Sequence, residues 1–360
     1  MTILHTESSI GWGGQEIRIV QESAGIARRG KHVLIAAPVH SNIFRRAQDA
    51  GLQVLPAEFQ KKNPVSVFRM ASLIDRVRPD IINTHSSSDS WVSTIAAKLS
   101  KTVPKIIRTR HLSAAISRSY SNRLIYNSLP DAIITTGEEI RQMMIHKSGF
   151  AASKIVSIPT GIDIERFNPA KVKPAFQASG LAIGMVGVLR SWKGHSYFID
   201  AIPQILERIP DAFFYIVGDG PQRRHLDELV CNLAFKDRIV LLGHREDVPE
   251  IMASLDIIVH PSYANEGVPQ TLLQALAMEK AVIASDTGAI KEIIIDRKTG
   301  FLIEPRNPGQ ITERVTEFYN SIELRSDLGK QGRQLVERSY SLESMLNNID
   351  ALYRKLLANA

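Results

Sequence analysis

The 360-residue sequence has one cysteine and no apolar run that approaches the roughly 18 residues of a bilayer-spanning helix. With Cys231 alone, no disulfide can form within the chain. The first residues, MTILHTE, also lack the basic and apolar regions of a secretory signal peptide. We therefore expect a soluble protein of a reducing compartment, the cytoplasm.

Metal-binding patterns are lacking as well. The sequence has no Asp-x-Asp motif, which would hold a divalent cation together with a diphosphate. Cys231, His260 and the other histidines show no spacing typical of metal ligands. We expect no bound metal.

The composition is that of a folded protein of two domains. Charged residues make up 22% of the chain, hydrophobic residues 44%, and the mean hydropathy is −0.06, which excludes intrinsic disorder. Single hydrophobic cores stop growing at roughly 250–300 residues, and this chain is longer.

Acidic residues are scarce in the N-terminal half. Residues 1–168 carry 22 Lys and Arg against 13 Asp and Glu, a net charge of +9, whereas residues 169–360 carry −2. Residues 91–130 contain seven basic residues and no acidic one. Such a stretch attracts phosphate-rich partners or an anionic membrane face, although a solvated basic surface would have the same composition.

Short apolar runs alternate with amphipathic stretches along the whole chain, which is typical of βαβ units in parallel sheets. We predict strands at residues 2–5, 32–37, 80–85, 105–110, 131–136, 181–188, 212–217, 238–242, 257–260 and 281–284. Helices are predicted at residues 14–29, 65–77, 90–99 and 137–147. Both halves are therefore expected to be α/β, with a hinge marked by Pro159, Pro169 and Pro174.

The first strand-to-helix turn is rich in glycine. Gly13 and Gly14 lie directly before the first predicted helix. Glycines there allow the backbone to approach a phosphate closely, and the helix start offers N–H groups to it. A plain tight turn would use the same residues.

A second turn carries a carboxylate. Glu266 and Gly267 follow a strand that ends at His260, and a helix is predicted to open near Val268. Glu266 is thus placed to hold hydroxyl groups while the amides of residues 268–271 take a phosphate. The segment that approaches the phosphate comprises Gly267, Val268, Pro269, Gln270 and Thr271. Gln274 lies eight residues beyond Glu266, or two helical turns.

Four ordered segments resemble the retaining GT-B glycosyltransferases of family 4. They are IPTGIDIERFNP at 158–169, VGVLRSWKG at 186–194, VGDGP at 217–221 and EGVPQTLLQ at 266–274. The resemblance covers nearly the whole chain and implies two Rossmann-like domains that face each other across a cleft. It assigns residues 1–168 to acceptor binding and residues 169–340 to nucleotide-sugar binding. Residues 341–360 would form a C-terminal segment, with a helix at 342–357, that packs back on the N-terminal domain.

The resemblance also implies roles for basic residues. Lys193 matches a lysine that contacts the donor diphosphate, where fixed positive charge stabilises the leaving group. The family's usual arginine partner is replaced by Val188, and Arg190, two residues later, is the candidate to reach the same phosphates.

Glu266 matches the first of two paired glutamates, which holds hydroxyls of the transferred sugar. The second is replaced by Gln274, so the ribose of the nucleotide loses a charge-assisted hydrogen bond. Gly218 and Asp219 match a turn that borders the base pocket. His111 matches a histidine near the donor sugar, and His85 ends a strand in a similar position.

The family implies front-face attack, in which the leaving diphosphate helps to deprotonate the acceptor and the anomeric configuration is retained. The expected donor is a hexose-type nucleotide sugar, with UDP preferred over GDP, and no other cofactor is expected. The acceptor is expected to be a cell-surface glycan such as lipopolysaccharide core or a lipid-linked oligosaccharide.

The basic N-terminal half is the clue to the acceptor. We expect Arg108, Arg110, Arg118 and Arg123 to bind a phosphorylated acceptor or the inner face of the membrane, with peripheral attachment. Nucleic acid is not expected as a partner. Two alternatives stay open: a GT-B nucleotide-sugar epimerase, and a two-domain ligand-binding protein without chemistry.

Overall fold

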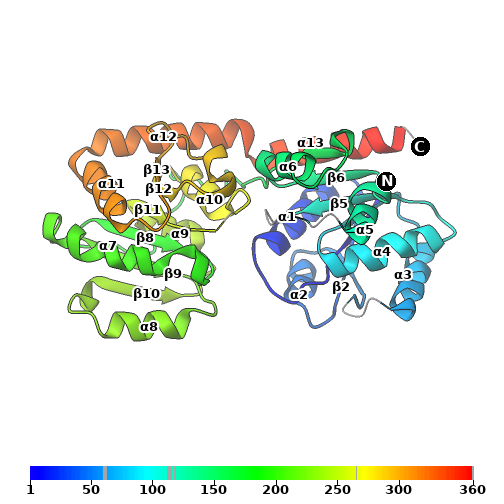
Figure 1. Ribbon diagram of the computed structural model, residues 1–360, viewed down its shortest axis with the longest axis horizontal. Coiled ribbons are helices and arrows are strands. Elements are labelled where there is room, and N and C mark those ends of the chain that lie inside the picture. The colour runs from blue at the N-terminus through cyan, green and yellow to red at the C-terminus, as the bar shows by residue number, and fades with distance from the viewer. Residues whose placement is uncertain (60–62, 112–115, 117–118, 265, 359–360) are drawn as a thin grey trace. The chain divides into compact units, whose positions relative to one another are not determined.

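The computed structural model describes residues 1–59, 63–111, 116, 119–264 and 266–358. The chain forms two compact units (Figure 1). Unit 1 comprises Met1–Gly161 and Glu343–Ala360, and unit 2 comprises Ile162–Leu342. In the described part of the chain no helix is long and apolar enough to cross a membrane.

Unit 1 is built on a seven-stranded parallel sheet with the strand order β3-β2-β1-β4-β5-β6-β7. Its strands are β1 (Thr2–Thr6), β2 (His32–Ala37), β3 (Gln53–Pro56), β4 (Ile81–Thr84), β5 (Lys105–Arg110), β6 (Ala132–Thr135) and β7 (Ile155–Ser157). Most of their side chains are buried, as expected for a parallel sheet covered on both faces.

Helices cover both faces of this sheet. They are α1 (Gly14–Arg28), α2 (Asn42–Asp49), α3 (Pro64–Val77), α4 (Ser87–Leu99), α5 (Tyr120–Arg123), the π-helical turn η1 (Leu124–Ser128), α6 (Glu138–His146), the 3₁₀ turn η2 (Ala152–Lys154) and α13 (Leu342–Ala358). Helices α1 and α2 pack with Ile35 and Ala37 of β2, whereas α3 and α4 pack with Leu34 and Ala36 of the same strand. Alternate residues of one strand therefore supply two separate cores.

Unit 2 contains a six-stranded parallel sheet with the order β10-β9-β8-β11-β12-β13. Its strands are β8 (Ala182–Val186), β9 (Phe213–Val217), β10 (Ile239–Gly243), β11 (Ile257–His260), β12 (Ala281–Ser285) and β13 (Phe301–Ile303). The expected α/β class is confirmed for both units.

The helices of unit 2 again divide between two faces. They are η3 (Ser191–Lys193), α7 (His195–Arg208), α8 (Arg223–Cys231), η4 (Lys236–Arg238), α9 (Val248–Ser254), α10 (Gln270–Ala277), η5 (Gly288–Glu292), α11 (Pro308–Asn320) and α12 (Ile322–Ser339). Helices α7, α8 and α11 share one core, which includes Ile183 and Phe214. Helices α9, α10 and α12 share the other, which includes Ile258 and Val282.

The chain passes between the units at 161/162 and again at 342/343, rather than at the predicted 168/169 and 340/341. Ile162 already belongs to unit 2, because its amide donates to the carbonyl of Tyr340 and its carbonyl accepts from the amide of Leu342, both at 2.8 Å. Phe167 is buried in a core of the same unit.

The last helix packs in unit 1, where α13 lies against α1. An added Cβ at Gly25 of α1 would lie 2.4 Å from a methyl carbon of Leu346. The amide of Gly161 also donates to Sδ of Met345, at 3.1 Å. Gly25 thus permits the close approach of the two helices.

Several elements were not predicted from the sequence. Among them are the short elements β3, β7, β13 and α2, which have three to eight residues and little room for a periodic pattern. The helices α7, α8, α9, α11 and α12 of unit 2 were not predicted either. The helix predicted from residue 90 begins at Ser87, because Ser86 and Asp89 form a capping box.

Leu346→Ala tests the docking of α13. Leu346 is only 3% exposed, so we expect the free energy of unfolding to fall by about 2–5 kcal/mol in urea denaturation. Leu99→Ala is the matched control, because Leu99 is 57% exposed. Equal losses in the two variants would contradict the packing of α13 on α1.

Candidate active site

Each sheet reverses its winding between two neighbouring strands. In unit 2 the reversal lies between β8 and β11, and in unit 1 between β1 and β4. Parallel α/β sheets bind ligands beyond the carboxyl ends of their strands at such points. The turns that follow these four strands are therefore the places where a site is expected.

In unit 2 the reversal brings together Lys193 and Glu266. Lys193 ends the turn η3 after β8, and Glu266 lies in the loop after β11. Lys193 Nζ and Glu266 Oε2 are 2.6 Å apart, and the two side chains are 19% and 13% exposed. Two residues predicted from separate motifs thus form one partly buried ion pair.

Two further side chains surround the Glu266 carboxylate. The hydroxyl of Ser262 donates to Oε1, and His260 Nε2 lies 3.6 Å from the same oxygen. Burial alone would raise the pKa of Glu266, but the positive charge of His260 when protonated and that of Lys193 hold it well below its usual range. Glu266 is therefore a carboxylate that can accept hydrogen bonds.

Burial disfavours the protonated forms of two histidines next to this pair. Burial lowers the pKa of His195 to about 4, with a further contribution from Lys193, and burial also lowers the pKa of His260. The charge of Lys193 is thus balanced by a single carboxylate within this cluster.

A glycine permits the close approach of the two turns. Gly194 has φ +79°, and a Cβ there would lie 2.0 Å from the carbonyl oxygen of Pro261. Because Lys193 precedes Gly194 directly, any larger residue at 194 would separate Lys193 from the loop of Glu266.

The turn after β9 closes tightly on the turn after β8. A Cβ at Gly218, where φ is +136°, would lie 1.9 Å from the carbonyl oxygen of Gly187. Asp219 is exposed, its carbonyl accepts from the amide of Leu189, and its carboxylate accepts from the amide of Gly220 at 2.7 Å. The structure therefore brings Gly218 and Asp219 beside the β8 turn.

Arg190 occupies the same β8 turn but points elsewhere. It is exposed, and its guanidinium lies over the ring of Trp192, 5.0 Å from the centroid. No hydrogen bond or ion pair of its side chain with Lys193 or Glu266 is found among the described residues. The structure does not bring Arg190 into this cluster.

Helix α10 begins at Gln270, not near Val268 as predicted. Pro269 has φ −72° and ψ 123°, an extended conformation, and its carbonyl accepts the amides of Leu272 and Leu273. Gln274 consequently lies one turn into the helix and not two turns beyond Glu266. Val268 and Pro269 are buried, and Gly267, Gln270, Thr271 and Gln274 are partly exposed.

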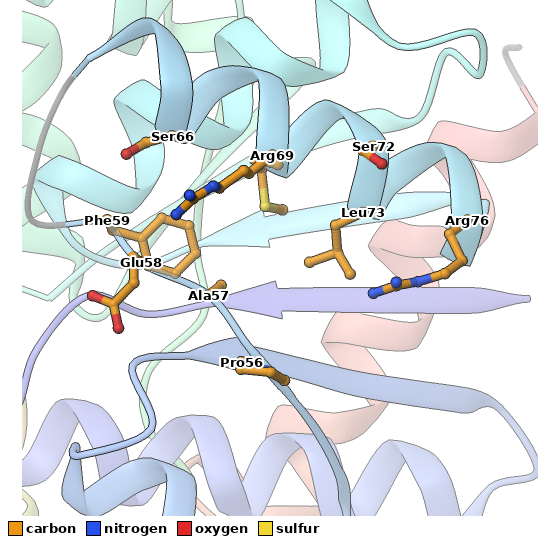
Figure 2. Close-up of a pocket in the computed structure, with 10 residues that line it drawn as sticks. Pro56, Ala57, Glu58, Phe59, Ser66, Arg69, Ser72, Leu73 and Arg76 are labelled. Carbon is orange, nitrogen blue, oxygen red and sulfur yellow. The ribbon is translucent and has the colours of Figure 1, made fainter.

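In unit 1, a small pocket lies between α3 and the segment that follows β3 (Figure 2). Its volume is about 210 Å³. The apolar part of its lining includes Phe59 and Leu73, and the charged part comprises Glu58, Arg69 and Arg76. Nothing in the sequence motifs had pointed to this pocket.

Two carboxylates lie at the reversal in unit 1. Glu7 accepts hydrogen bonds from the amide of Ser9 at 2.7 Å, from Gln15 Nε2 at 2.5 Å and from the hydroxyl of Ser86. Asp89 accepts from Thr6 Oγ1 at 3.0 Å. Burial, together with the charge of Glu7, raises the pKa of Asp89 to about 7.

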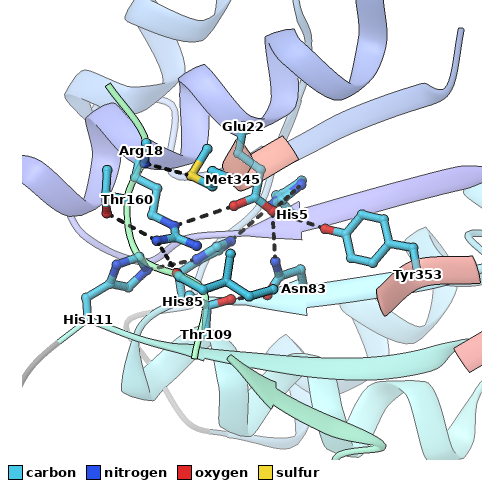
Figure 3. Close-up of polar contacts among 12 residues, drawn as sticks. His5, Arg18, Glu22, Asn83, His85, Thr109, His111, Thr160, Met345 and Tyr353 are labelled. Atoms are coloured by element: carbon cyan, nitrogen blue, oxygen red, sulfur yellow. Dashed lines mark hydrogen bonds and ion pairs between the residues drawn. The ribbon is translucent and has the colours of Figure 1, made fainter. Parts of the chain in front are cut away.

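Three histidines form a hydrogen-bonded row beside these carboxylates (Figure 3). His111 Nε2 lies 3.1 Å from His85 Nδ1, and His85 Nε2 lies 2.9 Å from His5 Nδ1. Burial lowers the pKa of His5 and holds the pKa of His85 and His111 well below the usual range. His85 and His111, both singled out in the sequence, therefore belong to one cluster.

Gly13 caps α1 with an extended backbone, φ −163°, so its conformation does not require glycine. A Cβ at Gly13 would lie 3.6 Å from Glu16 Oε2, an ordinary contact. Gly14 is the first residue of the helix.

The predicted basic surface of residues 91–130 is only partly a surface. Arg108 is 3% exposed, and its guanidinium donates to the carbonyl of Ser86, to the hydroxyl of Ser90 and to Tyr126 Oη. Its expected contact with a membrane is therefore wrong, because these internal hydrogen bonds hold the charge inside the fold.

The other predicted basic residues differ in exposure. Arg110 is partly buried and donates to Tyr126 Oη at 3.4 Å, whereas Arg123 is exposed in α5. Arg118 lies outside the described residues.

The sequence did not single out the buried members of the unit 1 cluster. They are His5, Glu7, Arg18, Glu22, Asp89 and Tyr353. One signal was available, because Arg18 and Glu22 are a helical i, i+4 pair on the side of α1 that also carries Ile19 and Ile26.

Within the described ranges, no three His, Cys, Asp or Glu side chains come together as a metal site.

Both halves of the chain match known glycosyltransferase families. Residues 12–166 match the family described as "Glycosyltransferase Family 4", and residues 168–335 match "Glycosyl transferases group 1". A relative from Escherichia coli, UDP-Gal:alpha-D-GlcNAc-diphosphoundecaprenol alpha-1,3-galactosyltransferase, is 28% identical over 322 residues, which cover 83% of this chain and 81% of the relative.

Solved structures show the same fold. A glycosyltransferase from Rickettsia africae superposes with a TM-score of 0.89 at 24% identity, covering 100% of this chain and 99% of that one. The Anabaena protein HepE, in complex with UDP and glucose, superposes with a TM-score of 0.87 at 19% identity, covering 99% and 100%.

The fold is therefore GT-B, as expected, and the protein is a glycosyltransferase. The chain belongs to glycosyltransferase family 4.

The buried histidines predict how stability depends on pH. His5, His85, His111, His195 and His260 all have lowered pKa values in the folded state. Below about pH 6.5 the unfolded chain binds more protons than the folded one, so the free energy of unfolding should fall as the pH drops from 7 to 5. Each histidine contributes up to about 1.4 kcal/mol per pH unit.

Urea denaturation at pH 5, 6 and 7 measures this slope. Asp89 acts in the opposite direction, because its raised pKa favours the protonated folded state as the pH falls. His195→Gln should flatten the slope, whereas His146→Gln should not, because His146 is exposed. A free energy that is constant or rises toward pH 5 would contradict the neutral histidines.

Proposed function

We propose that the protein transfers a hexose-type sugar from a UDP-sugar to a lipid-linked glycan, with retention of the anomeric configuration and without a metal ion. The observation that carries this proposal is the partly buried pair of Lys193 and Glu266 at the reversal of the unit 2 sheet, with 2.6 Å between Nζ and Oε2. The pair combines a fixed cation with a hydroxyl acceptor, which are the two groups that a nucleotide sugar needs.

A nucleotide sugar would divide the pair between its two chemical parts. Its diphosphate carries negative charge that grows as the glycosidic bond breaks, and Lys193 stabilises that charge. Glu266, held as a carboxylate, accepts hydrogen bonds from sugar hydroxyls. Without donor, the two side chains neutralise each other, which avoids an uncompensated charge in a partly buried place.

The surrounding turns supply the remaining donor contacts. Gly218 and Asp219 border the β8 turn and are assigned to the nucleotide, as is Gln274 one turn into α10. The segment of Gly267, Val268, Pro269, Gln270 and Thr271 leads into α10, whose N-terminal end favours an anion. Arg190 would have to leave the Trp192 ring to reach a phosphate.

The relatives support UDP as the nucleotide and a lipid-linked acceptor. The name of the E. coli enzyme states a UDP-galactose donor and a diphosphoundecaprenol acceptor, and HepE was solved with UDP and glucose. Front-face attack, with the leaving phosphate as base, is the mechanism we assign. Lipopolysaccharide core is the second acceptor class to be tried.

Lys193→Ala tests the donor site. We expect kcat to fall by about 10²–10³, because the leaving diphosphate loses its fixed charge. Lys171→Ala is the matched control, since Lys171 is an exposed lysine of unit 2 that pairs with Glu165. Release of UDP and free sugar without acceptor gives the rate, and thermal unfolding confirms the fold of each variant.

UDP-, GDP- and ADP-sugars should be compared in the same assay. Slow hydrolysis of a UDP-sugar supports the proposal. Epimerised or unchanged donor contradicts it, and normal turnover of Lys193→Ala would exclude Lys193 from the site.

We assign the membrane contact of unit 1 to α3 and the pocket beside it. Val65 and Phe68 of this helix are 55% and 66% exposed, and Arg69 and Arg76 line the pocket (Figure 2). Exposed apolar groups next to arginines suit the boundary between acyl chains and anionic headgroups. This assignment places the protein at the inner face of the membrane, and it replaces the role first given to Arg108.

The triple variant Phe68→Ser, Arg69→Gln, Arg76→Gln tests the membrane contact by co-sedimentation with vesicles that contain anionic lipid. Each arginine near such a surface contributes ~1 kcal/mol, so the two charges alone should lower binding about thirtyfold. The control Ile322→Ser, Arg224→Gln, Arg338→Gln removes one apolar side chain and two arginines from exposed positions of unit 2. Equal binding by both variants would refute the assignment to α3.

A further inference from the structure

The row of histidines in unit 1 ends at a buried carboxylate. His5 Nε2 lies 4.0 Å from Glu22 Oε1, and both side chains are fully buried. The row therefore runs from Glu22 through His5 and His85 to the partly exposed His111 (Figure 3).

Its neighbours fix Glu22 as a hydrogen-bond acceptor. Tyr353 Oη donates to Glu22 Oε1 at 3.1 Å, and Asn83 Nδ2 approaches the same oxygen at 3.4 Å. Asn83 is held in this orientation because its Oδ1 accepts from Thr109 Oγ1 at 2.8 Å. The other carboxylate oxygen lies 3.6 Å from Nε of Arg18.

Arg18 is itself held in place within the same unit. Its Nη1 donates to the carbonyl of Ile158 at 2.8 Å and to Thr160 Oγ1 at 3.1 Å. Breaking a buried pair such as Arg18 and Glu22 leaves an uncompensated charge, so the carboxylate is a fixed feature of the fold.

A neutral imidazole has one donor nitrogen and one acceptor nitrogen. A lone pair on His5 Nε2 would face the Glu22 carboxylate unfavourably, so the proton lies on that nitrogen and Nδ1 is the acceptor. His85 then donates from Nε2 to His5 and accepts at Nδ1. His111 in turn donates from Nε2 to His85, which leaves its Nδ1 without a proton.

At the outer end of the row, no hydrogen bond to His111 Nδ1 is found among the described residues, and His111 is a partly buried residue. The row needs the rings of His5 and His85 to be neutral, because a second proton on either would set two donors against each other. The lowered pKa values of His5 and His85 agree with that requirement.

We propose that Glu22, His5 and His85 are positioning residues that hold His111 in the Nε2-protonated tautomer, so that His111 Nδ1 accepts a hydrogen bond from a substrate hydroxyl. The part that concerns substrate rests on the proposed function. The ligand this selects has a free hydroxyl at that position, and a deoxy or O-methyl analogue lacks the donor.

The tautomers are measured on the full chain with ¹⁵N-labelled histidine, by long-range ¹H–¹⁵N spectra assigned through single His→Gln variants. We expect the Nε2-protonated form alone for His5, His85 and His111 in the unaltered protein. His5→Leu removes the ring that connects His85 to Glu22, so His111 should show both tautomers. A wild-type His111 with its proton on Nδ1, or with both forms, would overturn the proposal.

Tyr353→Phe is the matched control. It removes a hydrogen bond from the same carboxylate but leaves the acceptor in place, so stability should fall while the tautomer of His111 stays the same. If His5→Leu does not fold, the double variant Arg18→Leu, Glu22→Leu removes the charged end without leaving an unpaired charge. If His111 keeps its single tautomer in either folded variant, the proposal that Glu22 sets this tautomer through His5 and His85 is refuted.

Kinetics of the same variants separate this inference from the proposed function. The KM for the hydroxyl-bearing substrate should rise about two- to tenfold in His5→Leu, with the Kd for UDP unchanged. An unchanged KM in a variant with mixed tautomers overturns the substrate role of His111 Nδ1. If the tautomers behave as expected but no nucleotide sugar is consumed, the positioning of His111 is supported and the proposed transferase activity is contradicted.

Discussion

The reversal of strand order in each sheet is the constraint on which both charged clusters depend. In unit 2, α7 follows β8 onto one face and α10 follows β11 onto the other, and in unit 1, α1 and α4 divide in the same way. The buried or partly buried polar side chains of both clusters lie where these helices diverge. Polar groups in such a place must satisfy one another, since an unpaired buried group is costly. The ion pair of unit 2 and the histidine row of unit 1 are two solutions of this requirement.

The two clusters differ in what they keep charged. In unit 2, Lys193 and Glu266 are both ionised, and the neighbouring histidines are neutral. Such a pair can exchange its internal contact for contacts with a charged ligand. In unit 1 the charge of Glu22 and Arg18 lies at the buried end, and neutral rings carry its effect outward. The first cluster offers charge to a ligand, and the second offers a defined pattern of donors and acceptors.

The sequence predicted the α/β class and most strands, because parallel strands read as short apolar runs between amphipathic helices. Family motifs also singled out Lys193 and Glu266, but the bond between them joins turns 73 residues apart, and no local pattern shows such a contact.

Counting charges gave the wrong surroundings for Arg108, because composition says nothing about burial. The helix start at Gln270 was missed because proline fixes φ but leaves ψ free, so Pro269 was equally compatible with a helical and an extended conformation. His5 and Glu22 stayed hidden, since a polar residue inside a strand or helix acquires meaning only from its tertiary partners.

The return of α13 to unit 1 sets the order in which the two units are completed. Unit 2 is one continuous stretch, whereas unit 1 needs Leu346 and Tyr353 from beyond it. At typical rates of ~5–20 residues per second, a ribosome spends roughly ten to forty seconds on the intervening 181 residues. Throughout that time the face of α1 at Gly25 lacks the Leu346 side chain that covers it in the folded unit. Unit 1 therefore begins to emerge before unit 2 and is completed after it.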